Sequence, residues 1–154
     1  MGAVYFYHLT DTPLDQTLPM LVGKARGAGW RVLVRGRQTP HLERLDRVLW
    51  QGAPTGFLPH GMSGGAHDAQ QPVLLGVDVP SEGFDCVMSV DGAALSAAEV
   101  GLLRRACILF DGNDDAALQH ARGQWKMLSD AGCEAQYWAQ DMGSWVKKAE
   151  SKGA

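Results

Sequence analysis

The chain has 154 residues, of which 45% are hydrophobic and 20% are charged, and its formal net charge is −3. This size and composition predict one globular domain with its own core and leave no room for a second. The acidic balance disfavours a protein that mainly grips nucleic-acid phosphates, because such proteins carry a basic excess on at least one face.

The cysteines Cys86, Cys107 and Cys133 are far apart and show no CxxC or histidine-paired spacing. Such a pattern predicts neither a disulfide framework nor a zinc site, and it fits small core residues in a reducing compartment. The N-terminus lacks the cationic start and apolar run of a signal peptide, and no stretch is long enough to span a bilayer. We therefore expect a cytoplasmic protein without membrane contact.

Short apolar runs alternate with segments of helical periodicity along the chain, and this alternation predicts an α/β domain. Several of the runs lack polar alternation, as expected of strands that are covered on both faces of a sheet. The predicted strands are residues 4–9, 30–34, 72–77, 84–90, 107–110 and 134–138.

The first two helices are predicted between the early strands. The first lies within 13–28, where apolar residues recur on one face before a glycine-rich stop. The second begins at Thr39 as N-cap, with Pro40 at the first helical position, and ends near residues 50–52.

Two further helices are predicted in the second half of the chain. The third opens with the capping-box pair Ser96 and Glu99 and runs to about Arg105. The fourth has Asn113 as its expected N-cap and Gly132 as its C-terminal stop.

Trp125 lies at the border of the apolar stripe of the fourth helix, with Arg122 and Lys126 just beyond it. A half-exposed indole beside two cations can accept an apolar side chain while the cations take a carboxylate. Alternatively, Trp125 belongs to the core and both cations are solvated flank charges. The periodicity alone leaves both interpretations open.

The segment from Gln51 to Gln71 has no periodicity and is longer than most connections within a compact domain. The segment follows Trp50 and contains Phe57, Leu58 and Met62. So many large apolar residues close together are unusual in a solvated connection. Such a loop either folds back onto the core or is offered to a partner.

The usual catalytic motifs are missing. The glycine-rich segment GKARGAG follows a helical pattern and lacks the spacing of a P-loop or a dinucleotide fingerprint. The histidines at positions 8, 41, 60, 67 and 120 match no common ligand motif, and helix capping explains the acidic segment DGNDD better than a calcium loop does. We predict no catalytic residue, no cofactor and no metal site.

Several segments form an ordered pattern over nearly the whole chain: FYHL, GWRVLVR, LDRVLWQG followed by FLPHG, QPVLLG, and LFDGNDDAALQHARGQWKMLSDAG leading into YW. Together they resemble the chi subunit of bacterial DNA polymerase III holoenzyme. The resemblance implies a three-layer α/β/α sandwich around a mainly parallel central sheet. It also implies a non-catalytic accessory of the clamp-loader assembly that bridges the psi subunit to the acidic C-terminal tail of single-stranded DNA-binding protein and contacts DNA only indirectly.

The same resemblance implies two binding surfaces. The tail-binding helix corresponds to Arg122, Trp125 and Lys126. The psi-facing surface corresponds to a set of residues around the apolar loop, namely Trp50, Phe57, Leu58, Pro59 and His60.

Residues 1–145 are expected to form the single chi-like domain, with residues 146–154 as a flexible C-terminal tail. Two other function classes are weaker alternatives on the sequence. One is an enzyme with an unrecognised site, which a deep pocket with convergent titratable groups would favour; the other is a nucleic-acid-binding module, which a basic stripe would favour.

Overall fold

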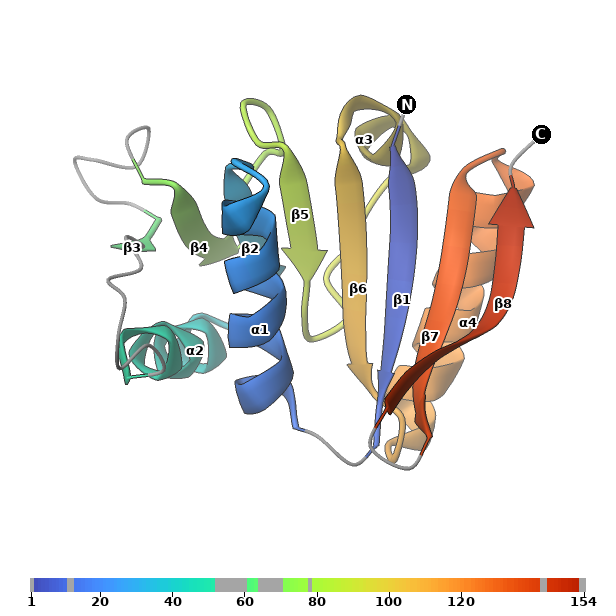
Figure 1. The fold of residues 1–154 in the computed structure, drawn as a ribbon, viewed down its shortest axis with the longest axis horizontal. Helices are drawn as coiled ribbons and strands as arrows, with labels where there is room; N and C mark the ends of the chain where they lie inside the picture. Colours follow the sequence, from blue (N-terminus) through green and yellow to red (C-terminus); the bar gives the residue numbers. More distant parts are fainter. Residues whose placement is uncertain are drawn as a thin grey trace.

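The computed structural model describes residues 2–10, 13–51, 61–63, 71–77, 79–141 and 144–152, and within them eight strands form one sheet (Figure 1). The strands are β1 Ala3–Leu9, β2 Val32–Gly36, β3 Gly61–Met62, β4 Val73–Val77, β5 Cys86–Ser89, β6 Arg105–Asp111, β7 Glu134–Asp141 and β8 Ser144–Lys152. The helices are α1 Leu14–Gly27, α2 Thr39–Gln51, α3 Ala97–Leu102 and α4 Asp115–Asp130.

The strand order is β3-β4-β2-β5-β6-β1-β7-β8, and every pair is parallel except β7 and β8. The first strand of the chain therefore lies inside the sheet, between β6 and β7. Helices α1 and α2 lie in front of the sheet in Figure 1, and α3 and α4 lie behind it. The predicted three-layer α/β sandwich with a mainly parallel sheet is confirmed.

Each face of the sheet has its own apolar core, and β1 contributes to both because its side chains alternate. Tyr7 and Leu9 pack with the residues of α1 and α2. Val4 and Phe6 pack with the residues of α3 and α4.

Local capping explains where α3 and α4 begin. Ser96 and Glu99 form the predicted capping box, with the Ser96 side chain accepting from the Glu99 N–H. α3 ends at Leu102 rather than at Arg105, which begins β6. The expected N-cap of α4 was wrong by one residue: the Asp114 carboxylate accepts from two backbone N–H groups of the first turn.

The expectation of a flexible tail from residue 146 needs correction, because Ser144–Lys152 form strand β8. β8 pairs antiparallel with β7 and places Trp145 against Tyr7, with ring centroids 5.4 Å apart. β3 and β8 are the two strands that the sequence pattern did not predict. Both lie at the ends of the sheet.

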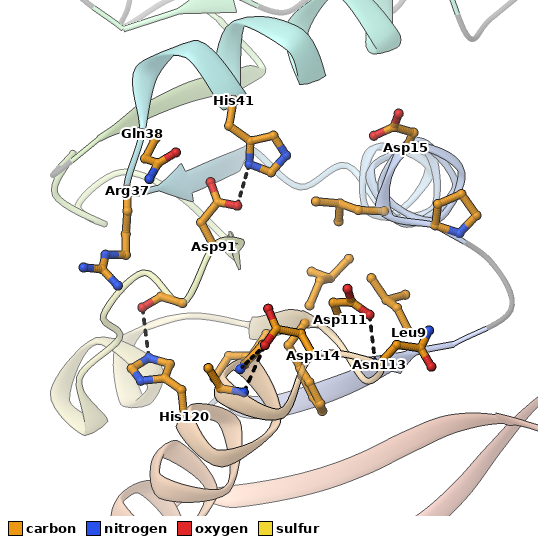
Figure 2. Close-up of a pocket in the computed structure, with 18 of the residues that line it drawn as sticks. Leu9, Asp15, Arg37, Gln38, His41, Asp91, Asp111, Asn113, Asp114 and His120 are labelled. Carbon is orange, nitrogen blue, oxygen red and sulfur yellow. Dashed lines mark hydrogen bonds and ion pairs between the residues drawn. The ribbon is translucent and has the colours of Figure 1, made fainter.

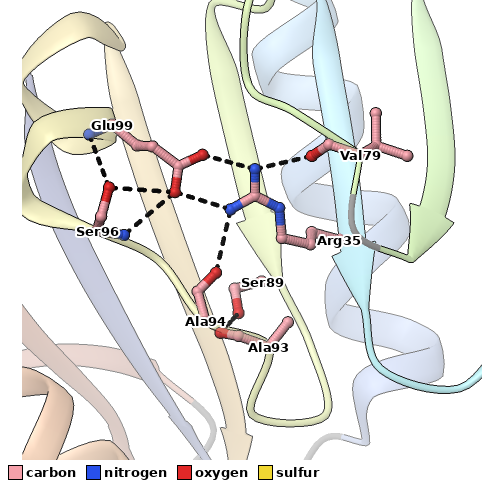
Figure 3. A network of polar contacts seen from close by, with 7 residues as sticks. All are labelled: Arg35, Val79, Ser89, Ala93, Ala94, Ser96 and Glu99. Carbon is pink, nitrogen blue, oxygen red and sulfur yellow. Dashed lines mark hydrogen bonds and ion pairs between the residues drawn. The ribbon is translucent and has the colours of Figure 1, made fainter.

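A buried ion pair ties β2 to α3 (Figure 3). Arg35 is 7% exposed, and its guanidinium donates to Glu99 at 2.7 and 3.1 Å and to the carbonyl oxygens of Val79 and Ala94. The hydrogen bonds from Arg35 lower the pKa of the Glu99 carboxyl to about 2. Arg35 thus connects β2 to two other parts of the chain. Its contact with Val79 holds the segment between β4 and β5, and its contacts with Ala94 and Glu99 hold the start of α3.

Cys86 and Cys107 are buried core residues and Cys133 is partly exposed, and none of the three forms a disulfide. In the described part of the chain, no helix has the length and apolarity that a membrane crossing requires.

Candidate functional site

The exposed side of α4 carries the two cations that the sequence places beside Trp125. Ala121, Gln124 and Leu128 are the buried residues of this helix. Arg122 and Lys126 are exposed, and the helical period places both of them on the solvent side of the half-buried Trp125. The structure therefore brings together all three predicted tail-binding residues on one helix, at the edge of its buried face.

Trp125 is anchored by other aromatic rings. Its ring centroid lies 5.3 Å from that of Phe6, with the planes at 65°, and 5.9 Å from that of Tyr137, with the planes at 77°. Both are edge-to-face arrangements, which are favourable for aromatic pairs. One part of the indole thus belongs to the core behind α4 while another part is exposed, so the two interpretations of the sequence each describe part of this side chain.

Neither cation is committed to an internal partner among the described residues. The ion pairs found there join other side chains, and neither the guanidinium of Arg122 nor the ammonium of Lys126 takes part in them. An exposed cation without an ion pair keeps its charge available to a ligand. Arg122 in particular presents a planar fork that fits a carboxylate at two points.

The charge of Arg122 acts on a histidine and a tyrosine, His8 and Tyr137, which no local sequence pattern indicates. The Nδ1 of His8 lies 2.7 Å from the hydroxyl oxygen of Tyr137. Burial lowers the pKa of His8, and the positive charge of Arg122 lowers it further. Burial raises the pKa of Tyr137 while Arg122 opposes that rise, so one guanidinium acts on both groups.

These groups come from elements that are far apart along the chain. His8 is on β1, Tyr137 is on β7, and the parallel pairing of the two strands places them side by side below α4. The local patterns around each residue contain no indication of this, because the adjacency follows from the strand order. Burial and Arg122 lower the pKa of His8 while Asp111 opposes them, so Arg122 adds a positive charge beside the aromatic cluster of Phe6, Trp125 and Tyr137.

The predicted psi-facing residues fall almost entirely outside the described residues. Trp50 is part of the α2 backbone, but its side chain is not described. The remaining four, Phe57, Leu58, Pro59 and His60, lie outside the described ranges. This part of the site stays a prediction from sequence.

The described residues contain no group of three or more His, Cys, Asp or Glu side chains placed to hold a metal ion.

The chain matches a known protein family and resembles solved structures. Residues 1–136 match the family described as DNA polymerase III chi subunit, HolC. The chain is also similar to the C-terminal domain of a possible DNA helicase from Lactobacillus plantarum WCFS1, at 13% sequence identity over 72% of this chain and 74% of that chain, with a TM-score of 0.47. A likeness as weak as the latter carries no functional implication.

Proposed function

The chain belongs to the DNA polymerase III chi subunit family, and from that premise we propose that it bridges two partners within the replicative clamp-loader assembly. One partner is the psi subunit, and the other is the acidic C-terminal tail of single-stranded DNA-binding protein. The family itself establishes an accessory role in DNA polymerase III. The identity of the two partners and the residues that bind them belong to the proposal.

The observation that supports the tail-binding half is the geometry around Trp125. A half-exposed indole, fixed against Phe6 and Tyr137, lies beside two exposed cations that have no ion pair among the described residues. A rigid aromatic anchor next to free cations is the arrangement that an acidic peptide with an apolar end requires.

The proposed contacts divide the tail between the three side chains. Arg122 takes the terminal carboxylate of the final Phe through two N–H donors, because the guanidinium fork matches a carboxylate. The Phe ring packs beside Trp125. Lys126 attracts the acidic side chains further upstream, mainly as a point charge.

The psi-facing half of the proposal relies on the apolar segment after α2. Trp50, Phe57 and Leu58 bring three large apolar side chains into a short stretch of sequence that also holds Pro59 and His60, which is unusual for a solvated connection. The two surfaces use different parts of the chain, so both partners can bind at once.

The proposed role requires no chemistry from this chain. We infer a non-catalytic subunit without cofactor, which reaches DNA only through its partners and works in the cytoplasm, where a bacterial replisome assembles. Its contribution is to hold the clamp loader and the protein-coated single strand close together, which raises the effective concentration of one for the other.

The deciding experiment titrates the whole protein into a fluorescent acidic peptide that ends in Phe, measured by anisotropy. The control is the same peptide with its C-terminal carboxylate converted to an amide. We expect the free acid to bind at least about tenfold more tightly, because the charge-assisted contact to Arg122 is lost in the amide. Equal affinity of the two peptides would contradict carboxylate recognition.

A further inference from the structure

The two ends of the sheet differ greatly in length. At one end, β3 has only two residues. At the other end, β8 has nine residues, and Figure 1 shows no described element beyond its outer side. The outward N–H and C=O groups of a long edge strand can pair with a further strand. β8 also lies beyond residue 136, where the match to the chi subunit family ends.

A β-bulge in β8 changes which of its side chains share a face. Tyr137 pairs with Ala149 whereas Trp138 pairs with Lys147, so Lys148 is the extra residue of the bulge. Two residues that are three apart in a regular strand lie on opposite faces. Because of the bulge, Lys147 and Glu150 lie on the same face, and their side chains form an ion pair at 3.1 Å.

The opposite face of β8 exposes an apolar side chain. Val146 pairs with Ala139 of β7, and Ser151 pairs with Ala135, whose side chain is buried in the core behind the sheet. Val146 is 38% exposed and is one of the few large apolar side chains that the described residues expose. A strand added to the outer side of β8 would place its own side chains next to Val146.

The sequence of β8 is complementary to a second copy of itself. Two identical strands can pair antiparallel about a twofold axis perpendicular to the sheet. In one such register, Lys147 lies opposite Glu150 of the second copy, and Glu150 lies opposite Lys147 of that copy. The same register places Val146 opposite Ser151 of the second copy, so each opposed pair shares a face of the joined sheet.

Other registers are disfavoured by charge. Shifting one copy by one, two or three residues in one direction brings a lysine opposite a lysine, because Lys147 and Lys148 are adjacent. Shifting it by three residues in the other direction brings Glu150 opposite its own copy. Like charges that lie directly opposite each other in a sheet are destabilising. The charges therefore select the register that pairs Lys147 with Glu150.

The side chains of this register have capacity for the additional contacts. Glu150 accepts from Lys147 and from the amide of Gln136 within its own chain. A carboxylate has about four acceptor positions and an ammonium group has three donors, so each can also bind its counterpart in the second copy. The net charge of −3 on each chain opposes association only weakly, since repulsion is screened beyond about 8 Å at physiological ionic strength.

We propose that β8 pairs with β8 of a second copy of this chain, antiparallel about a twofold axis, with Lys147 of each copy opposite Glu150 of the other. The two sheets then form one continuous sheet. Because the axis is perpendicular to the sheet, α4 of both copies lies on the same side of it. The pairing uses neither the predicted tail-binding residues nor the predicted psi-facing residues, and it does not depend on the proposed bridging function.

The test measures the mass of the whole protein by sedimentation equilibrium, without any partner. One pair of edge strands covers less surface than a permanent dimer requires, so we expect a reversible dimer with a dissociation constant on the order of 10–100 μM. The concentrations should bracket this value, from about 5 to about 500 μM.

Charge reversal separates this contact from a general effect of charge. Lys147→Glu turns two attractive contacts of the dimer into repulsive ones, and we expect it to weaken dimerisation at least about tenfold. Glu150→Lys should act in the same way. The double variant Lys147→Glu with Glu150→Lys restores both pairs and should return within about threefold of the parent. Lys24→Glu is the matched control, because Lys24 is an exposed lysine of α1.

A disulfide cross-link tests the register itself. Val146→Cys combined with Ser151→Cys places two thiols opposite each other in the dimer, and oxidation should give a covalent dimer. Within one chain the two positions are about 17 Å apart along the strand, too far for an internal disulfide. Val146→Cys alone is the control, because its two copies are equally far apart in this register. The parent controls for cross-linking through Cys133, which is partly exposed.

Several results would overturn the proposal. Among them are a parent protein that stays monomeric over the whole concentration range, and equal dimerisation of Lys147→Glu and Lys24→Glu. Cross-linking of Val146→Cys alone as efficiently as of the double cysteine variant would refute the register. Growth to assemblies larger than a dimer would show a different contact, since the twofold pairing uses the outer side of β8 in both copies.

Discussion

The indole of Trp125 meets the ring of Phe6 edge to face, with their centroids 5.3 Å apart. Phe6 is fully buried on an interior strand of the sheet, so this contact fixes the exposed part of Trp125 relative to the core. A side chain held in this way loses little conformational freedom when it binds a ligand. The same contact makes Trp125 important for stability as well as for binding.

Trp125→Ala is therefore expected to lower both the stability and the tail affinity. Removing a half-buried indole from the Phe6 and Tyr137 rings should lower the free energy of unfolding by about 2 kcal/mol, measured in urea. Met127→Ala is the control, because Met127 is on the same helix and is 49% exposed. A Trp125→Ala protein as stable as Met127→Ala would contradict the packing role.

Acid should destabilise the protein partly through Glu99. Its pKa is lowered from 4.5 to about 2 in the folded state, chiefly by the hydrogen bonds from Arg35. A lowered folded-state pKa stabilises the fold above the unfolded value, and this contribution is lost as the pH falls from about 4.5 towards 2. At pH 7, Glu99→Gln should lower the free energy of unfolding by roughly 2 kcal/mol, and the difference from the parent should shrink steadily below pH 4.5.

The control for this measurement is Glu43→Gln, which changes an exposed glutamate on α2. We expect its unfolding free energy to follow that of the parent across the same pH range. A gap between Glu99→Gln and the parent that is constant from pH 7 to pH 2 would mean that the ionised pair does not provide the stabilisation.

Helix positions followed from local signals in the sequence, which is why they were predicted closely. The capping pair Ser96 and Glu99 marks the start of α3, and Gly132 follows α4 with a φ of +90° that favours glycine. Both signals act within a few residues. The expected N-cap of α4, Asn113, differs from the observed one by a single residue, because the neighbouring Asp114 has an equally suitable side chain.

Pairings between distant segments could not be predicted in this way. Nothing near Trp145 indicates that its strand pairs with β7, and nothing near His8 indicates that Tyr137 lies 2.7 Å away. The same holds for His41, Asp91 and His120, which follow different strands and line one pocket at one end of the sheet (Figure 2). The exposed cations on α4 were found because three residues within one helical turn are a local pattern.

Phe57→Ala tests the psi-facing surface that the sequence predicts. We expect it to weaken psi binding by roughly tenfold or more, since a large aromatic group in the centre of an interface often dominates its energy. Tail-peptide binding should stay within about twofold of the parent, because it uses α4. Co-purification with psi and peptide anisotropy provide the two measurements, and unchanged psi binding would refute the assignment of Phe57.

Arg122→Ala is expected to weaken tail binding by roughly ten- to hundredfold, since a charge-assisted contact contributes about 1.5–3 kcal/mol. Lys126→Ala should act less strongly and mainly at low salt, where the attraction of an exposed charge is least screened. Arg47→Ala removes the same charge from an exposed position on α2 and serves as control. Equal affinities of the Arg122 and Arg47 variants would show that only the net charge matters.

His8 provides a reporter for whatever binds at Arg122. Its pKa is lowered first by burial and then by the charge of Arg122, so Arg122→Ala should raise the pKa part of the way towards 6.5. Lys126 is not among the groups that shift this pKa, and Lys126→Ala should leave it unchanged. Both values can be measured from the His8 imidazole signals in an NMR pH titration.

Binding of the acidic tail should move the same signal in the same direction as Arg122→Ala. A peptide carboxylate on Arg122 partly cancels its positive charge at the imidazole, so the pKa of His8 rises and the complex takes up protons on binding below neutral pH. The C-terminal amide peptide lacks that carboxylate and should produce a smaller rise. If the free-acid peptide binds but the pKa of His8 does not change, the carboxylate lies elsewhere, because a negative charge in contact with Arg122 must alter the field at His8.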